Sequence, residues 1–169
     1  MNSKELKNLN TELKECFLNA GKRAIHLRDM GLKTEIKNDS TPVTNGDLEV
    51  NEILTNKIKE LTPNIPIVSE ESSLNKKSSD LTKFWLIDPI DGTYDYINNG
   101  EEFTLNAALI IKNKSIASIV YAPAKKRLFY SYGKGSSFEI NNYKTQKINC
   151  KKKTKKNNIV AVSYSKNLK

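Results

Sequence analysis

The sequence predicts an α+β protein in which two helices pack on a largely antiparallel sheet. Apolar residues in the first sixty positions recur at steps of three and four, the period of a helix with one buried side. Beyond Pro63 they come instead in short runs between turn-forming residues, as in strands. Helices followed by a series of strands are typical of the α+β class. The 169 residues suffice for one domain with a hydrophobic core, which we expect to span residues 1–169.

Two helices account for the first part of the chain. The first is predicted over residues 3–30 and ends at Gly31, because glycine is common just after a helix. Its apolar stripe consists of Leu6, Leu9, Leu13, Phe17, Ala20, Ala24 and Leu27. The second helix is predicted to begin near Thr44 or Asn45, since either side chain can cap it. It ends before Pro63, which cannot continue a helix.

Short apolar runs predict the strands. They are expected at residues 65–68, 84–87, 104–111, 115–121, 128–132, 137–140 and 159–163. Residues 34–42 and 72–82 lack an apolar pattern and are expected to form loops. Pro89 is expected to end the strand at 84–87, because proline donates no hydrogen bond to a sheet. Asn113 suits the turn of a hairpin.

The net charge of +9 arises at the end of the chain, where residues 141–169 hold nine lysines and no acidic residue. The lysine run at 151–156 lacks interleaved aromatic residues and arginine, so we interpret it as solvated and expect no nucleic-acid partner. A nucleic-acid binder is the alternative, and it would show steeply salt-dependent binding.

Several classes of protein and site are not indicated. The sequence has no apolar run of about 18 residues that would predict a transmembrane segment, and its first residues lack the core of a secretory signal. We therefore expect a cytoplasmic protein, with the periphery of the inner membrane as the alternative location. One histidine, His26, and two distant cysteines, Cys16 and Cys150, favour neither a zinc site nor a Ser-His-Asp triad. Catalysis would have to rest on carboxylates, hydroxyls or a metal ion.

The segment Asp-Pro-Ile-Asp-Gly-Thr, directly after the predicted strand at 84–87, has the residues that a hard cation needs. Asp88 and Asp91 can converge on one point, and a turn would free the carbonyl of Ile90 as a neutral ligand. Carboxylate, carbonyl and water oxygens are the ligands that Mg²⁺ prefers. Gly92 would let a substrate approach the backbone, and Thr93 offers a hydroxyl where a helix could begin and attract phosphate.

Other acidic residues can complete this cluster. Glu70 and Glu71 follow the predicted strand at 65–68, and Asp47 opens the second helix. Taken singly, Asp47 has a structural explanation as a helix N-terminal residue, and a pair of glutamates is usually solvated surface. Several carboxylates at one point repel one another unless a divalent cation neutralises them. The combination therefore indicates a metal site.

These residues resemble the lithium-sensitive phosphatases of the inositol monophosphatase superfamily, and most closely its 3′(2′),5′-bisphosphate nucleotidases. The resemblance begins near residue 38 and rests on five segments: residues 40–47, 61–71, 100–110, 120–123 and 159–165, together with the hexapeptide at 88–93. It implies the N-terminal half of the layered sugar-phosphatase fold. It also implies hydrolysis of adenosine 3′,5′-bisphosphate to AMP and phosphate, in sulfonucleotide recycling.

The resemblance also implies a role for each residue of the site. Glu70, Asp88 and the carbonyl of Ile90 would hold one Mg²⁺, and Asp88 and Asp91 would share a second. Two or three ions are expected, with inhibition by Li⁺. Thr93 would have a catalytic role: paired with Asp47 or Glu70, it would orient and deprotonate the attacking water.

The resemblance further implies how the substrate is held. The scissile phosphate of a small phosphate ester would be received by Glu70, Ile90, Asp91, Gly92 and Thr93. The oligomeric state is left open.

Two departures from the family pattern bear on these roles. Residues 94–96 read Tyr-Asp-Tyr where the nucleotidases have Lys-Glu-Phe, which is expected to alter substrate contacts. The family's C-terminal α/β half, with a Trp-Asp metal ligand, is expected to be absent, since Trp85 precedes leucine. Two alternatives therefore stand beside the nucleotidase: an inositol-phosphate phosphatase, and an inactive metal-binding fragment.

Overall fold

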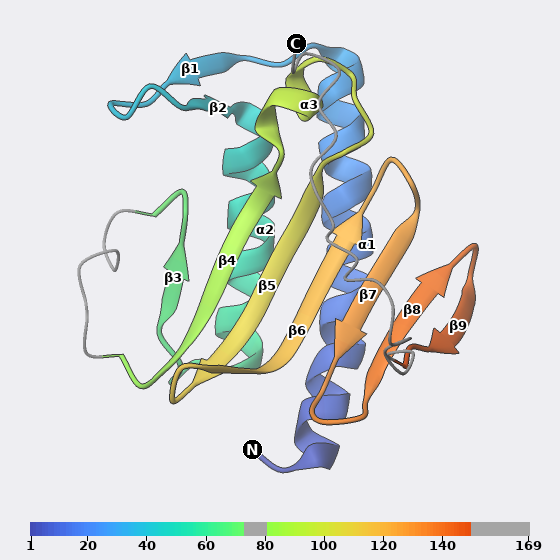
Figure 1. Ribbon diagram of the computed structural model, residues 1–169. Coiled ribbons are helices and arrows are strands. Elements are labelled where there is room, and N and C mark those ends of the chain that lie inside the picture. Colours follow the sequence, from blue (N-terminus) through green and yellow to red (C-terminus); the bar gives the residue numbers. More distant parts are fainter. Residues whose placement is uncertain (73–80, 150–169) are drawn as a thin grey trace, which may run out of the picture.

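The computed structural model describes residues 1–72 and 81–149. Two long helices, α1 (Ser3–Met30) and α2 (Asn45–Leu61), cover one face of a seven-stranded sheet, as Figure 1 shows. A short helix, α3 (Thr93–Ile97), lies at one end of the sheet. The predicted α+β class and the pair of helices on a largely antiparallel sheet are confirmed.

The sheet has the strand order β3-β4-β5-β6-β7-β8-β9. Its strands are β3 (Ile67–Ser69), β4 (Lys83–Asp91), β5 (Thr104–Ile111), β6 (Lys114–Ala122), β7 (Arg127–Ser131), β8 (Ser137–Asn141) and β9 (Lys144–Lys147). Among the strand pairs of the described residues in this sheet, only β3–β4 is parallel. Consecutive strands from β4 onwards are therefore neighbours, which the short turns between most of them allow.

Helix α1 has the predicted bounds because both of its ends are capped. The side chain of Asn2 accepts a hydrogen bond from the Glu5 amide, and the Glu5 carboxylate accepts one from the Asn2 amide. Gly31 follows the helix at φ 98°, a conformation that costs glycine little. None of the helices in the described part of the chain is apolar over enough length to cross a membrane.

The core lies between these helices and the sheet. Trp85 of β4 is fully buried, and its indole N–H donates to the Thr62 hydroxyl at 3.0 Å. Other fully buried large side chains come from every layer: Phe17, Leu13, Leu54, Ile58, Ile87, Leu105, Leu109 and Ile119. The opposite face of the sheet is more open, and Leu86 is 47% exposed there.

The prediction of a loop at residues 34–42 was incomplete, and strand β9 was not predicted. Residues 34–42 contain a hairpin, in which β1 (Thr34–Ile36) pairs with β2 (Pro42–Thr44). Every residue of β1 and of β9 is exposed, so neither strand carries the alternation of apolar residues that sequence patterns detect. The predicted strand at 159–163 lies outside the described residues, as do residues 73–80 of the predicted loop.

The prediction that Pro89 ends its strand was wrong. Strand β4 continues to Asp91, and the register against β5 shifts between Asp88 and Asp91. This shift is a β-bulge, where the ladder is locally interrupted and a residue without an amide hydrogen is tolerated.

Candidate active site

The bulge in β4 brings the two aspartates of the hexapeptide onto one face of the sheet. Asp88 pairs with Asn106 of β5, and Asp91 pairs with Thr104. Residues three apart in a regular strand point to opposite faces, but Asn106 and Thr104 are two apart and share a face. The extra residue in β4 therefore places Asp88 and Asp91 on the same side. This geometry replaces the tight turn that the sequence suggested.

Asp88 is held in an unfavourable environment for a negative charge. Its Oδ1 is buried and has no hydrogen-bond partner in the described chain. Burial raises the pKa of Asp88 to about 7, and the negative charges of Glu70, Asp91 and Asp47 add to this effect. The main cause is thus burial of the carboxyl group, and the neighbouring carboxylates add to it.

Glu70 is positioned by β3 and by a link to α2. Its amide donates to the carbonyl of Ile87 in β4 at 3.1 Å, which extends the parallel pairing by one residue. The hydroxyl of buried Ser69 donates to the Asn51 side chain of α2 at 2.6 Å. These contacts fix the backbone immediately before the glutamate.

Lys37, at the tip of the β1–β2 hairpin, contacts the glutamate pair. Its ammonium lies 2.6 Å from Glu71 Oε1 and 3.4 Å from Glu70 Oε1. Glu70 is therefore partly neutralised by a lysine, whereas Asp88 is not. Beside the glutamate pair, the protein therefore supplies a positive charge of its own, the ammonium group of Lys37.

Asp47 caps α2 and also reaches the hexapeptide. Its Oδ2 accepts hydrogen bonds from the Thr44 amide at 2.8 Å and the Thr44 hydroxyl at 2.5 Å. The Thr93 hydroxyl lies 3.4 Å from the other oxygen of Asp47 and 3.1 Å from the carbonyl oxygen of Ile90. Burial raises the pKa of Asp47 despite these hydrogen bonds. Asp47 and Thr93 therefore form a pair suited to moving a proton.

Two glycines allow these elements to meet. An added Cβ on Gly46 of α2 would lie 2.3 Å from the Tyr96 hydroxyl, so only glycine lets α3 pack there. Gly92 has φ 89°, and a Cβ on it would lie 2.6 Å from the Glu102 carbonyl oxygen. Close packing thus explains why residue 92 is a glycine, in addition to the predicted approach of substrate to its backbone.

The aromatic residues that depart from the family pattern differ in their environments. Tyr96 is fully buried, packs on Phe103 with ring centroids 5.0 Å apart, and donates its hydroxyl hydrogen to the Ala24 carbonyl at 2.7 Å. Tyr94 is 64% exposed at the start of α3. Tyr96 therefore serves the core, and Tyr94 is the aromatic residue next to the site.

The acidic groups are suited to a hard cation but are not arranged as a finished metal site. Across residues 1–72 and 81–149, no three acidic, histidine or cysteine side chains stand close enough together to hold an ion. The unpartnered Asp88 oxygen and the surrounding carboxylates nevertheless form the all-oxygen donor set that Mg²⁺ prefers. The residues therefore fit the predicted metal in their chemistry.

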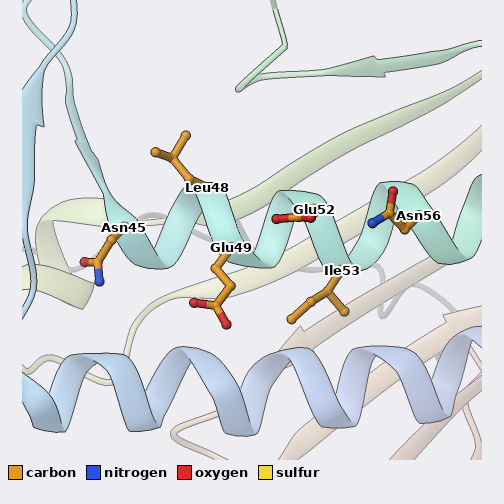
Figure 2. Close-up of a pocket in the computed structure, with 6 residues that line it drawn as sticks. All are labelled: Asn45, Leu48, Glu49, Glu52, Ile53 and Asn56. Atoms are coloured by element: carbon orange, nitrogen blue, oxygen red, sulfur yellow. The ribbon is translucent and has the colours of Figure 1, made fainter.

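The outer side of α2 has acidic residues of a different kind. Figure 2 shows Glu49 and Glu52 beside Leu48 and Ile53, around a hollow of about 490 Å³. Glu49 forms an ion pair with Arg23 of α1. This hollow contains none of the predicted site residues, so the outer face of α2 is separate from the cluster around Asp47.

The structure brings some of the predicted residues into contact, while their roles stay predictions. Thr93 contacts both Asp47 and the Ile90 carbonyl, and the charges of Glu70 and Asp91 act on the carboxyl group of Asp88. The sequence analysis missed the supporting roles of Lys37, Asn51, Ser69, Gly46 and Tyr96. Each acts through a contact with a residue distant in the sequence, and a single sequence carries no signal for such pairs.

The chain belongs to the inositol monophosphatase family, which it matches over residues 4–168. It is 36% identical to the 3′(2′),5′-bisphosphate nucleotidase CysQ of Haemophilus influenzae over 115 residues, which are 66% of this chain and 42% of that protein. It is 34% identical to CysQ of Escherichia coli O157:H7 over 124 residues, which are 72% of this chain and 50% of that protein. The chain thus spans about half the length of these curated relatives.

Solved structures confirm the fold. A CysQ from Bacteroides thetaiotaomicron matches 80% of this chain and 49% of its own length, with a TM-score of 0.60 and 23% identity. A staphylococcal inositol monophosphatase-1, solved as a LiCl-soaked inhibitory complex, matches 82% of this chain and 52% of its own, with a TM-score of 0.70 and 23% identity. An inositol monophosphatase/NADP phosphatase solved with Mg²⁺ and phosphate matches 79% and 51%, with a TM-score of 0.70 and 23% identity.

Proposed function

We propose that this chain carries the catalytic centre of a Mg²⁺-dependent phosphomonoesterase that converts adenosine 3′,5′-bisphosphate to AMP and phosphate. The observation that carries this proposal is the unpartnered, buried oxygen of Asp88 among the charges of Glu70 and Asp91. Such repulsion is tolerated where a divalent cation binds. The nucleotide substrate is supported by the similarity to CysQ proteins.

The ligands proposed for the metal are those nearest the bulge. Glu70, Asp88 and the carbonyl of Ile90 would hold one Mg²⁺, and Asp88 with Asp91 would share a second, with room for a third left open. Mg²⁺, when bound, supplies positive charge that neutralises these carboxylates and makes water easier to deprotonate. Inhibition by Li⁺ is part of the proposal and is supported by the LiCl complex of the staphylococcal relative.

The proton of the attacking water would pass to the Asp47–Thr93 pair. The Thr93 hydroxyl lies within hydrogen-bond distance of both Asp47 and the Ile90 carbonyl. When it donates to Asp47, its own oxygen can accept a proton from water while Asp47 accepts the proton of Thr93. The water oxygen then bonds to phosphorus, and the bond from phosphorus to the 3′ oxygen of the ribose breaks. The departing oxygen takes up a proton from solvent. Glu70, Asp91 and the backbone of Ile90, Gly92 and Thr93 would hold the phosphate.

Two other candidates are tested beside the nucleotidase. An inositol-phosphate phosphatase is favoured by the fold, because several of the solved structures with this fold are inositol monophosphatases. The other candidate is a metal-binding chain without turnover. Both candidates keep the carboxylate cluster. They differ from the nucleotidase in the ester that is hydrolysed once the metal is bound, or in whether any ester is hydrolysed.

Phosphate release from adenosine 3′,5′-bisphosphate and from inositol 1-phosphate tests these candidates side by side. Each is assayed with Mg²⁺, with EDTA, and with Mg²⁺ plus Li⁺, for the wild type and for Asp88→Asn. We expect phosphate release from the nucleotide only when Mg²⁺ is present, and a lower rate when Li⁺ is added. In Asp88→Asn the rate of release should fall by at least about 100-fold. Glu60→Gln, an exposed acid on α2, is the matched control and should leave the rate unchanged.

The same samples separate the alternatives. Preference for inositol 1-phosphate would overturn the nucleotide assignment. A thermal midpoint raised by Mg²⁺ without phosphate release would identify the metal-binding fragment. If Mg²⁺ caused neither thermal stabilisation nor phosphate release, the proposed metal site itself would be contradicted.

A further inference from the structure

A second cavity lies between α1 and the sheet, away from the acidic cluster. It has a volume of about 430 Å³, within the size range of small-molecule sites. Leu18, Gly21, Lys22 and Ile25 line it from one side of α1, at the spacing of a helix face. The other wall comes from the end of β6, the turn after it, and the β8–β9 hairpin. Figure 1 shows α1 passing behind β6 and β7. We call this cavity the α1 pocket.

Tyr121 supplies a polar group to the α1 pocket. The residue lines the pocket and is only 6% exposed, and its hydroxyl oxygen is not one of the buried atoms that lack a hydrogen-bond partner in the described chain. Its ring lies against Gly21, where an added Cβ would come within 2.3 Å of the Tyr121 Cε1 atom. Tyr121 therefore brings to the wall of the α1 pocket a hydroxyl that can donate or accept a hydrogen bond with a ligand.

The charges around the α1 pocket are positive. Lys22 of α1 and Lys126 of the β6–β7 turn both line it, and neither makes an ion pair within residues 1–72 and 81–149. Among the residues that the structure describes, none that lines the pocket is acidic. Two unpaired ammonium groups beside apolar walls favour an anion that also has an apolar body.

The rim of the α1 pocket has an aromatic residue in an uncommon conformation. Tyr143 is 99% exposed and has φ 65°, in the two-residue turn between β8 and β9 where glycine is preferred. A bulky residue in this left-handed region costs free energy, and such residues gather at ligand-binding sites. The side chain of Tyr143 lines the α1 pocket.

We propose that the α1 pocket binds an amphipathic anion, with a flat apolar body carrying a sulfonate, carboxylate or phosphate. The body lies against Leu18, Ile25 and Ile140. The anionic group meets Lys22 and Lys126, the Tyr121 hydroxyl supplies a hydrogen bond, and Tyr143 covers the ligand. This site shares no residue with the acidic cluster and does not depend on the proposed phosphatase activity.

Titration with 8-anilinonaphthalene-1-sulfonate, followed by fluorescence and calorimetry, tests this site. For a ligand of this size we expect one saturable site with a Kd of about tens of micromolar. Neutralising both lysines in Lys22→Gln/Lys126→Gln should weaken binding by about tenfold. Tyr121→Phe keeps the ring against Gly21 and removes only the hydroxyl, and should weaken binding by about threefold to tenfold.

Matched controls separate this site from general adsorption. Lys4→Gln/Lys7→Gln makes the same change of charge on an exposed part of α1 and should leave the Kd unchanged. N-phenyl-1-naphthylamine, which lacks the sulfonate, should bind more weakly than the sulfonate. Equal affinity of the two probes would overturn the anion site, as would a Kd that neither pocket variant alters. Absence of saturable binding at millimolar probe would overturn the pocket altogether.

Discussion

The two halves of β4 differ in what their side chains do. Residues 83–87 pair with β5 in regular register, and Trp85 and Ile87 alternate into the core. The register shifts between Asp88 and Asp91, and residues 88–91 present two carboxylates on the opposite face, one with an oxygen that has no partner in the described chain. The first half of the strand is therefore organised for burial, whereas the second half also holds a carboxylate that burial destabilises.

This difference explains where the site lies. The regular half gains free energy from each buried apolar side chain, about 1.5–3 kcal/mol for a large one. The bulged half forces the Asp88 carboxyl among other acids, which no packing requirement demands. Groups that oppose stability tend to be retained for function. Substitutions in the two regions should accordingly affect different measurements.

The largest expected effect is on turnover, at Asp47. In Asp47→Asn an amide oxygen still accepts the cap hydrogen bond from the Thr44 amide, but the group can no longer take a proton. Phosphate release should fall by about 10²–10⁴-fold, while the Mg²⁺ affinity changes by less than about threefold. Steady-state kinetics and a Mg²⁺ titration of stability measure the two separately.

Glu52→Gln is the matched control on the same helix, because its side chain lies on the outer face shown in Figure 2. It should alter neither quantity. If Asp47→Asn kept full activity, the Asp47–Thr93 pair would be a helix cap and nothing more.

The next effect concerns the packing that joins α2 to α3. Gly46→Ala forces a methyl group against the Tyr96 hydroxyl, so α3 must shift and carry Thr93 with it. The free energy of unfolding should fall by about 1–3 kcal/mol, together with phosphate release. Gly31→Ala is the control, since its added methyl meets no atom and only the backbone strain remains. It should cost stability without a specific loss of activity. Equal losses in both variants would contradict this role of Gly46.

The fold was predictable where burial imposes a period on the sequence. Helix α1 and strand β5 have the predicted bounds, because each presents a regular apolar stripe to the core. Strands β1 and β9 are wholly exposed and depend on backbone hydrogen bonds, which leave no pattern in the side chains. The predicted end of the strand at Pro89 was wrong because the exclusion of proline from strands does not hold at a bulge.

The site was predictable where its residues are close together in the sequence. The hexapeptide could be identified because Asp88, Ile90 and Thr93 lie within six positions. The contacts of Lys37 with the glutamate pair span more than thirty positions and have no local signature. The resemblance to a family linked Asp47 and Glu70 to the hexapeptide, which composition and spacing alone could not do.

A smaller effect is expected from pH on the metal-free protein. The pKa of Asp88 is about 7 in the folded chain against an ordinary 3.8, so the folded state keeps a proton that the unfolded state releases. Stability contributed by this group should therefore fall as pH rises from about 4 to about 7, and stay low above that. Asp88→Asn should remove this decline and raise stability above pH 7 by on the order of 1–2 kcal/mol.

Urea unfolding in EDTA at a series of pH values measures this effect. The difference between wild type and Asp88→Asn cancels the contributions of other titrating groups. A difference that does not vary with pH would show that Asp88 is not strained in the folded state, and the contrast between the halves of β4 would fail.

The smallest effect is expected far from the acidic cluster, in the turn between β5 and β6. Lys112 and Asn113 both have positive φ, 48° and 60°, in a two-residue loop that favours Asn-Gly. Lys112→Asn/Asn113→Gly should therefore raise the free energy of unfolding by about 0.5–1 kcal/mol, measured by urea denaturation. Mg²⁺ affinity and phosphate release should not change, because the turn serves only the fold. A change in Mg²⁺ affinity or in phosphate release would mean that the antiparallel strands transmit strain from this turn to the bulge of β4, so that the turn and the bulge are not independent.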